Sequence, residues 1–450
     1  MPWLSILDRE HTIARPGFSR WLVPPAALSV HLAIGEAYAF NVFNQPLTRT
    51  LGIQQSTPAD WQLTTLGWIF SLAMVFLGLS AALFGKWLER AGPRKAMLAS
   101  ALCFGAGFLV SALGVWLHQI ALLYLGYGVL GGIGLGLGYI SPVSTLMKWF
   151  PDRPGMATGL AIMGFGGGAM IGGPLAVRLM KHFESSTSTG VAETFVVLGI
   201  GYFAFMLFGA ATVRLPPPGW TPAGWSPTSR PNKLVTTAQV TADSALRTPQ
   251  FYLLWCVLFL NVTAGIGILG QTSVMVQDMF PGVTQEVAGG LVGLLSLFNM
   301  GGRFFWSSLS DILGRKATYA MYFLLGACLY GLIPLAGERR SLVMFVSLTV
   351  VIMSMYGGGF ATIPAYLRDL FGTLQVGAVH GRLLTAWSAA GIAGPLLVNY
   401  LRQYQIDRGV PRMQAYDATM YLMAGLLVLG AVCNFLMTPV AARHHHHGTG

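Results

Sequence analysis

Apolar residues run along the chain in twelve long stretches, separated by polar segments that are mostly short. A helix needs about 20 apolar residues to cross the hydrocarbon core of a membrane, and each stretch reaches that length. The pattern therefore predicts twelve transmembrane helices. They cover residues 22–44, 62–85, 96–117, 120–147, 155–178, 194–213, 251–277, 287–309, 317–336, 342–366, 376–400 and 415–437.

One polar segment, residues 214–250, is much longer than the others and is rich in Pro, Thr and Ser. It divides the predicted spans six and six, which is typical of a linker between two helical bundles. We therefore expect an N-terminal segment, a first bundle, a linker, a second bundle and a tail, at residues 1–21, 22–213, 214–250, 251–437 and 438–450.

The two halves share landmarks at an offset of about 222 residues. The pairs are Glu89 with Asp311, Pro142 with Pro364, and Gly173-Pro174-Leu175 with Gly394-Pro395-Leu396. Parallel repeats of this kind are expected to place a binding site between the halves, near the middle of the membrane.

Two of these landmarks lie in loops that join an acid, a glycine and basic residues. The first loop contains Glu89, Arg90 and Arg94, and the second contains Asp311 and Arg315. A carboxylate at a helix end beside cations can form a gate that opens and closes during a transport cycle. The alternative is that the charges only fix the orientation of the helices in the membrane.

Composition and charge agree with a membrane protein. Hydrophobic residues make up 54% of the chain and charged residues only 10%, against about 25% in soluble domains, which excludes a soluble enzyme, a disordered chain and a disulfide scaffold. The net charge is +11, and 18 of the 27 Lys and Arg residues fall on one predicted side. This bias places both termini in the cytoplasm, and it explains the positive charge without a nucleic-acid partner. We expect the protein in the cytoplasmic (inner) membrane of the cell.

Three short motifs carry a resemblance to a known family. They are His31-Leu-Ala-Ile-Gly-Glu-Ala-Tyr-Ala-Phe40, Gly302-Arg303-Phe-Phe and Leu384-Thr-Ala-Trp387. With the twelve spans, the chain resembles the major facilitator superfamily, and these motifs resemble its oxalate/formate antiporter family, which is similar to the monocarboxylate transporters. The resemblance implies an all-α membrane fold of two pseudo-symmetric six-helix bundles. It also implies a monomeric transporter of small carboxylates, surrounded by lipid, that is not an enzyme and uses no cofactor or metal.

The most informative single residue is Arg303, a cation deep inside a predicted span. It recurs at helical spacing with Ser296, Asn299, Ser307 and Ser310, so these residues form one polar stripe that should face a water-filled cavity. A planar guanidinium matches the two oxygens of a carboxylate. We therefore expect Arg303 to bind the substrate, the alternative being a structural ion pair.

The resemblance also bears on the kind of carboxylate. Trp387 occupies a position where the oxalate-transporting prototype of the family has a lysine. With that cation absent, a monocarboxylate such as formate, lactate or pyruvate is favoured over oxalate. His380 is predicted on the same helix face as Trp387 and adds charge only when it is protonated.

Aromatic residues are expected to wall the binding site, since they exclude water and strengthen an ionic contact. By resemblance, the residues that line the chamber are His31, Tyr38, Tyr356, Phe360 and Trp387. Tyr139, just before the Pro142 kink, is a further candidate. Aromatic residues at helical spacing are also ordinary packing, which is the alternative for each of them.

Glu36 is the only acid deep inside a predicted span. It and His380 are candidates for proton coupling, in which a proton travels with the anion instead of a second anion travelling against it. Two other functions stay open. One is copper import through a Met275–Met279 pair, although the next span lacks the histidine that copper-importing relatives have, and the other is an anion receptor without transport.

Overall fold

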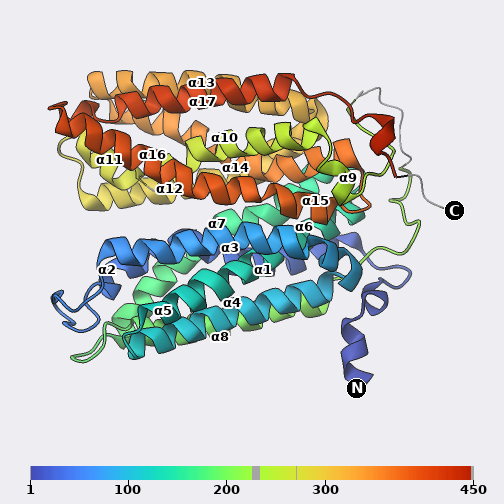
Figure 1. Ribbon diagram of the computed structural model, residues 1–450, viewed down its shortest axis with the longest axis horizontal. Helices are drawn as coiled ribbons and strands as arrows, with labels where there is room; N and C mark the ends of the chain where they lie inside the picture. Colours follow the sequence, from blue (N-terminus) through green and yellow to red (C-terminus); the bar gives the residue numbers. More distant parts are fainter. Residues whose placement is uncertain (1, 226–233, 270, 447–450) are drawn as a thin grey trace. The chain divides into compact units, whose positions relative to one another are not determined.

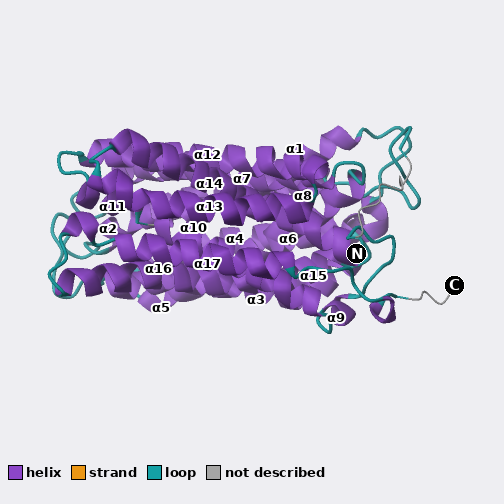
Figure 2. Ribbon diagram, turned by 90° about the horizontal axis from the view of Figure 1, so that it is seen from above, coloured by secondary structure: helices purple, strands orange, loops and turns teal. Residues whose placement is uncertain are grey.

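The computed structural model describes residues 2–225, 234–269 and 271–446, and of residues 2–4 and 268 it describes the backbone alone. Apart from one isolated bridge between Ile13 and Leu215, this part of the chain is helix and loop, with the loops at the helix ends (Figure 2). Part of the predicted linker (226–233) and of the tail (447–450) lies outside the described residues.

The chain divides into two compact units. The first is formed by Met1–Asp152, Leu160–Ser229 and Gln375–Thr385, and the second by Arg153–Gly159, Arg230–Leu374 and Ala386–Gly450. The first turn of one helix, residues 153–159, thus belongs to the second unit, while residues 375–385 belong to the first.

The first unit contains six long membrane-spanning segments. Their helices are α1 (Val23–Ile34) continued by η4 (Gly35–Phe43) and α2 (Asn44–Leu47), α3 (Leu63–Ala91), α4 (Pro93–Trp116), α5 (Ile120–Leu123) continued by η5 (Tyr124–Gly131) and α6 (Gly132–Trp149), α7 (Pro154–Phe183) and α8 (Val191–Thr212). Here η4 is a 3₁₀ helix and η5 a π helix. Within this unit α4 packs along α8, and α3 packs against α6 and against α15 (Val376–Leu383) (Figure 1). The short 3₁₀ turns η1 (Pro2–Leu7), η2 (Arg9–Thr12) and η3 (Arg20–Leu22) precede α1.

The second unit contains the remaining long helices. They are α10 (Pro249–Leu269), α11 (Thr272–Met279), α12 (Gln285–Leu313), α13 (Arg315–Glu338), α14 (Leu342–Phe371), α16 (Thr385–Asp407) and α17 (Asp417–Phe435), with the short turns α9 (Ala242–Ala245), η6 (Arg412–Gln414) and η7 (Ala442–His444). Within it α12 packs along α14, and α13 packs along α17 (Figure 1).

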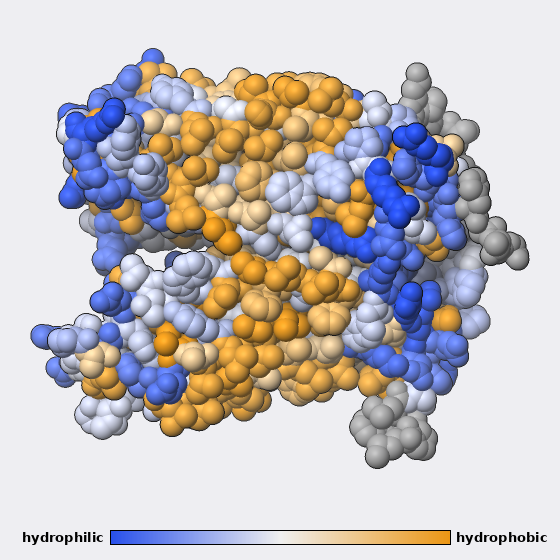
Figure 3. All heavy atoms as spheres, in the orientation of Figure 1, coloured by the Kyte–Doolittle hydropathy of each residue, from blue (hydrophilic) through white to orange (hydrophobic). Residues whose placement is uncertain are grey.

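Among the described residues, eleven of the twelve predicted spans coincide with helices that are long and apolar enough to cross a membrane. On the visible face of each unit, apolar residues cover the middle of the helices and polar residues gather at their ends (Figure 3). The exception is the predicted span 376–400. There the helix is interrupted at the single residue Leu384, which divides the segment into α15 and α16.

Small residues allow the closest helix contacts. On α7, a Cβ at Gly168 would lie 2.4 Å from the Leu32 carbonyl oxygen, and one at Gly35 would lie 2.3 Å from the Phe165 carbonyl oxygen. Only glycine at both positions lets the backbones of α1 and α7 approach this far. The glycines of α7 therefore determine where the residues of α1 and η4 lie.

Candidate functional site

The second unit holds Arg303 at the centre of a buried group of polar and aromatic side chains. Arg303 lies on α12 and is 0% exposed. Its Nε donates a hydrogen bond of 3.1 Å to Asn299 Oδ1, one turn earlier on the same helix. Its guanidinium carbon lies 5.3 Å from the centre of the Phe360 ring on α14. The two contacts orient the plane of the guanidinium.

Aromatic rings extend this group. The Phe360 ring lies 4.7 Å from Trp387 on α16 and 5.3 Å from Tyr356 on α14. Three helices of one unit therefore bring together Arg303, Asn299 and the three aromatic residues that the sequence proposed for this half. We call these five residues the Arg303 cluster.

The serines of the predicted stripe behave differently from Arg303. Ser307 donates to the Arg303 carbonyl oxygen at 2.5 Å, and Ser310 donates to the Ser307 carbonyl oxygen at 2.6 Å. Hydroxyls on helices commonly bond to their own backbone in this way. Of this stripe, Asn299 and Arg303 therefore supply the side-chain chemistry of the cluster.

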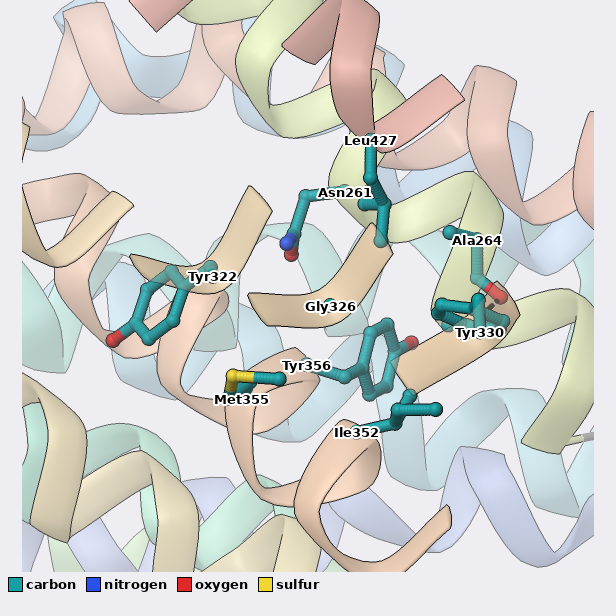
Figure 4. A pocket seen from close by; sticks show the side chains of 10 residues that line it. Asn261, Ala264, Tyr322, Gly326, Tyr330, Ile352, Met355, Tyr356 and Leu427 are labelled. Atoms are coloured by element: carbon teal, nitrogen blue, oxygen red, sulfur yellow. Dashed lines mark hydrogen bonds between the residues drawn. The ribbon is translucent and has the colours of Figure 1, made fainter. Parts of the chain in front are cut away.

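Tyr356 also borders a small cavity inside the second unit. Figure 4 shows the side chains that line this cavity, which come from α10, α13, α14 and α17 and include Asn261 and Tyr330. Tyr330 donates to the Ala264 carbonyl oxygen at 2.8 Å, while the buried Asn261 Oδ1 has no hydrogen-bond partner among the described residues. This cavity adjoins the Arg303 cluster through the Tyr356 ring, and nothing in the sequence pattern had pointed to Asn261.

The first unit holds a second set of predicted site residues. The Tyr139 ring on α6 lies 5.4 Å from His31 on α1 and 5.8 Å from His380 on α15. Phe165 on α7 lies 5.6 Å from Tyr139 and 5.0 Å from Tyr38. Nδ1 of His31 donates to the Ala27 carbonyl oxygen at 3.2 Å. His380 therefore packs with Tyr139, and the turn at Leu384 separates it from the helix that carries Trp387.

Glu36 lies apart from this aromatic set, although it is on the same span. It is 0% exposed, and its Oε2 accepts a hydrogen bond of 3.1 Å from the Tyr127 hydroxyl. Tyr127 comes from η5 and was not expected from the sequence. Tyr127 could not be predicted as a partner of Glu36 because it lies in a π helix, and the spacing of apolar residues does not predict π helices.

The acids of the two loop motifs lie in the last turns of α3 and α12, and each binds the first turn of another helix. Asp311 accepts hydrogen bonds from the backbone N–H of Gly155 at 2.8 Å and of Met156 at 2.9 Å, in the first turn of α7. Glu89 accepts one from the N–H of Gly377 at 3.0 Å, in the first turn of α15. Helix N-termini carry unpaired N–H groups and favour negative charge. Gly155 and Gly377 differ by the repeat offset of 222 residues, a signal that could have identified both.

Basic residues complete these loops unequally. Arg315 pairs with Asp311 at 2.6 Å and with Asp369 at 3.2 Å, whereas Glu89 pairs with Lys148 at 2.8 Å. Arg94 is buried and donates to the Ile6 carbonyl oxygen, and Arg90 is exposed. Lys148 and Asp369 are partners that the loop motifs alone did not reveal, because they come from other helices. These contacts are those of a network that holds helix ends together.

Comparisons with known proteins agree with this architecture. A family model described as Major Facilitator Superfamily matches residues 26–395 and, in a further match, residues 281–449. The chain belongs to the major facilitator superfamily. It is therefore a multi-pass membrane transporter and not an enzyme, as the sequence predicted.

Individual relatives are distant but cover most of the chain. The oxalate:formate antiporter of Oxalobacter formigenes is 26% identical over 84% of this chain and 83% of its own, and monocarboxylate transporter 11 of Homo sapiens is 25% identical over 90% and 82%. Among solved structures, the outward conformation of the transporter FucP superposes with a TM-score of 0.64 at 15% identity, over 91% of this chain and 98% of its own. That likeness supports the major facilitator fold.

Proposed function

We propose that this transporter carries small organic carboxylates and that Arg303 binds the carboxylate group. The observation that carries the proposal is the guanidinium itself, which is fully buried and oriented by Asn299 and by the Phe360 ring. A planar guanidinium is the side-chain group that matches the two oxygens of a carboxylate bidentately. Similarity to an oxalate:formate antiporter and to a monocarboxylate transporter supports this substrate class.

Within that class we favour monocarboxylates such as formate, lactate and pyruvate over oxalate. Trp387 adds an uncharged ring 4.7 Å from Phe360, so the surroundings of Arg303 are suited to one negative charge. Aromatic surroundings exclude water and strengthen a single ionic contact. Tyr356 belongs to the same cluster, while His31, Tyr38 and Tyr139 stay predicted substrate residues that alanine variants test one at a time.

The proposed cycle is alternating access of a monomer in the inner membrane, with both termini in the cytoplasm. A bound anion neutralises Arg303, and moving a charge without its partner through an apolar environment is costly. The carrier with a bound anion therefore changes between its two orientations faster than the empty carrier, and this gives anion exchange. Transport of a proton together with the anion would give symport instead. The Glu89 and Asp311 loops, with Arg90, Arg94 and Arg315, are the proposed gates.

Uptake of labelled formate, lactate and oxalate into proteoliposomes tests the proposal. We expect Arg303→Gln to abolish uptake, and Arg303→Lys, which keeps the charge but loses the planar fork, to lower it at least about 10-fold. Arg178→Gln is a matched control because Arg178 is exposed on α7. Each variant is checked for folding by its unfolding temperature in detergent.

Two results would overturn the proposal. Wild-type uptake by folded Arg303→Gln would remove Arg303 from the substrate site. A wild-type protein that moves none of the three anions would remove the carboxylate assignment. The same vesicles then test uptake of labelled copper(I) for the Met275–Met279 alternative. Binding of an anion without flux would instead identify a receptor.

A further inference from the structure

Glu36 occupies a fully buried position in the first unit, with one neutral hydrogen-bond donor. Its Oε2 accepts from the Tyr127 hydroxyl at 3.1 Å, and its Oε1 has no hydrogen-bond partner among the described residues. The hydroxyl of Tyr202 on α8 is also buried without a partner among them. A Cβ on Gly172 would lie 3.0 Å from that hydroxyl and 3.1 Å from Glu36 Cγ, so the glycine leaves room for both groups.

The charged and titratable groups around Glu36 are few. From η5 it faces Tyr127 and from α8 it faces Tyr202, while α7 contributes the backbone at Gly172. In the part of the chain that the structure describes, Glu36 makes no ion pair with Lys, Arg or His. Burying a carboxylate without a cation costs several kcal/mol, whereas a neutral carboxyl group is tolerated.

Two departures from regular α-helix meet at this carboxyl group. Span one changes from α-helix to 3₁₀ helix at Gly35, and Glu36 is the second residue of the 3₁₀ segment Gly35–Phe43. The partner Tyr127 lies in the π helix Tyr124–Gly131 of span four. Such interruptions inside long helices often mark hinges or functional sites. Glu36 is therefore placed where a change in its own charge can alter the geometry of two spans.

We propose that Glu36 is the proton-binding residue of the carrier and that it is protonated in the arrangement described here. This inference rests on the proposed function and adds the coupling ion to it. One proton binds to the carboxyl group from one side of the membrane and leaves to the other, so the carboxyl group ends the cycle as it began. One proton and one monocarboxylate then cross together without net charge movement.

The experiment compares two uptake modes in the same proteoliposomes. One is formate or lactate uptake driven by an inward proton gradient into empty vesicles, and the other is exchange against internal anion without a gradient. We expect the wild type to respond to the gradient, and Glu36→Gln to lower the ratio of gradient-driven uptake to exchange at least about 10-fold. Glu286→Gln, an exposed acid on α12, is the matched control that keeps the wild-type ratio.

A second readout is independent of any substrate. Infrared spectra of the wild type at neutral pH should show the carbonyl band of a protonated carboxyl group that is missing in Glu36→Gln. Tyr127→Phe removes a donor that stabilises the charged form, and should move the pH profile of the gradient response toward higher pH. If Glu36→Gln does not fold, the pH profile of Tyr127→Phe tests the proposal: a shift toward higher pH supports proton binding at Glu36, and an unchanged profile overturns it.

The outcomes separate this inference from the proposed function. Anion exchange with no response to the gradient, or an unchanged ratio in Glu36→Gln, overturns the inference and leaves carboxylate transport in place. Equal loss of both uptake modes with a lower unfolding temperature indicates a packing role and overturns it too. Absence of all anion flux overturns the proposed function, while the infrared band still tests proton binding at Glu36.

Discussion

Replacing Asp311 with alanine should release the first turn of α7. The carboxylate accepts the N–H groups of Gly155 and Met156 at 2.8 and 2.9 Å. Amides in the first turn of a helix have no acceptor within that helix. Both amides should therefore exchange their hydrogen with solvent faster in Asp311→Ala, and this follows from geometry inside the second unit alone.

The size of the effect can be worked from the contacts. A hydrogen bond to a charged group contributes about 1.5–3 kcal/mol. The Asp311 side chain is 14% exposed, so we take the lower part of this range, about 1.5 kcal/mol, for each amide. Since about 1.4 kcal/mol corresponds to a tenfold change, exchange at each amide should be about 10-fold faster. Asp311→Asn keeps one amide oxygen as an acceptor and should show a smaller increase.

Hydrogen–deuterium exchange read by mass spectrometry over residues 150–160 measures this directly. A matched variant is Glu89→Ala, which removes the acceptor of a single amide, Gly377, so the peptide around residue 377 should lose protection at one site and not two. A peptide from α4 is the internal reference for global unfolding. Unchanged exchange over residues 150–160 in Asp311→Ala would refute the claim that this carboxylate holds α7.

Three further predictions concern stability. Gly168→Ala should lower the unfolding temperature in detergent, since overpacking costs about 1–3 kcal/mol and the new Cβ would meet backbone at 2.4 Å, while Gly201→Ala, with nothing within 4 Å, should not. Arg402→Ala should also lower the unfolding temperature, because Arg402 bonds Asp278 at 2.6 Å and its loss leaves that partly buried carboxylate without its cation. Arg402→Lys should restore part of the lost unfolding temperature in the same assay. Burial acts to raise the pKa of Asp60, but hydrogen bonds from the backbone of its loop outweigh it and hold the pKa below the ordinary value. Its contribution to stability is thus present above about pH 4 and lost as the pH falls further, so Asp60→Asn should flatten the fall in unfolding temperature between about pH 5 and pH 3.

The positions of the spans could be predicted because the membrane imposes a single simple requirement. About 20 apolar residues must lie together for a helix to cross, and this holds whatever the neighbouring helices do. The span 376–400 is the instructive exception. Its apolar residues are spread over α15 and α16, and no Gly or Pro stands at Leu384 to mark the interruption in the sequence. Length and hydropathy therefore predict where the chain crosses but not where a crossing helix is broken.

The contacts of the two loop acids were not predicted from the sequence, although the repeat contained a signal for them. The sequence singled out Glu89 and Asp311 as equivalent, but it did not give them partners. Applying the same offset to the helix that follows would have paired Gly155 with Gly377, which are the amides that these two acids bind. The repeat does not predict the cation that pairs with each acid. Glu89 pairs with Lys148, which comes from another helix, whereas Asp311 pairs with Arg315 of its own motif.

The candidate site shows the same division within single helices. Asn299 and Arg303 are four residues apart on α12, which stays a regular α-helix throughout, so helical spacing alone brought them together correctly. On span one, spacing of 100° per residue fails after Ile34 because the chain continues as 3₁₀ helix. The partner of Glu36 comes from a π helix that is equally hidden from such spacing. A hydrogen bond between two side chains of one regular helix can be inferred from their spacing in the sequence. The hydrogen bond of a buried acid cannot be inferred in this way when both partners lie in irregular helical segments of different spans. That difference is the physical reason to test Arg303 for substrate and Glu36 for the proton as separate sites.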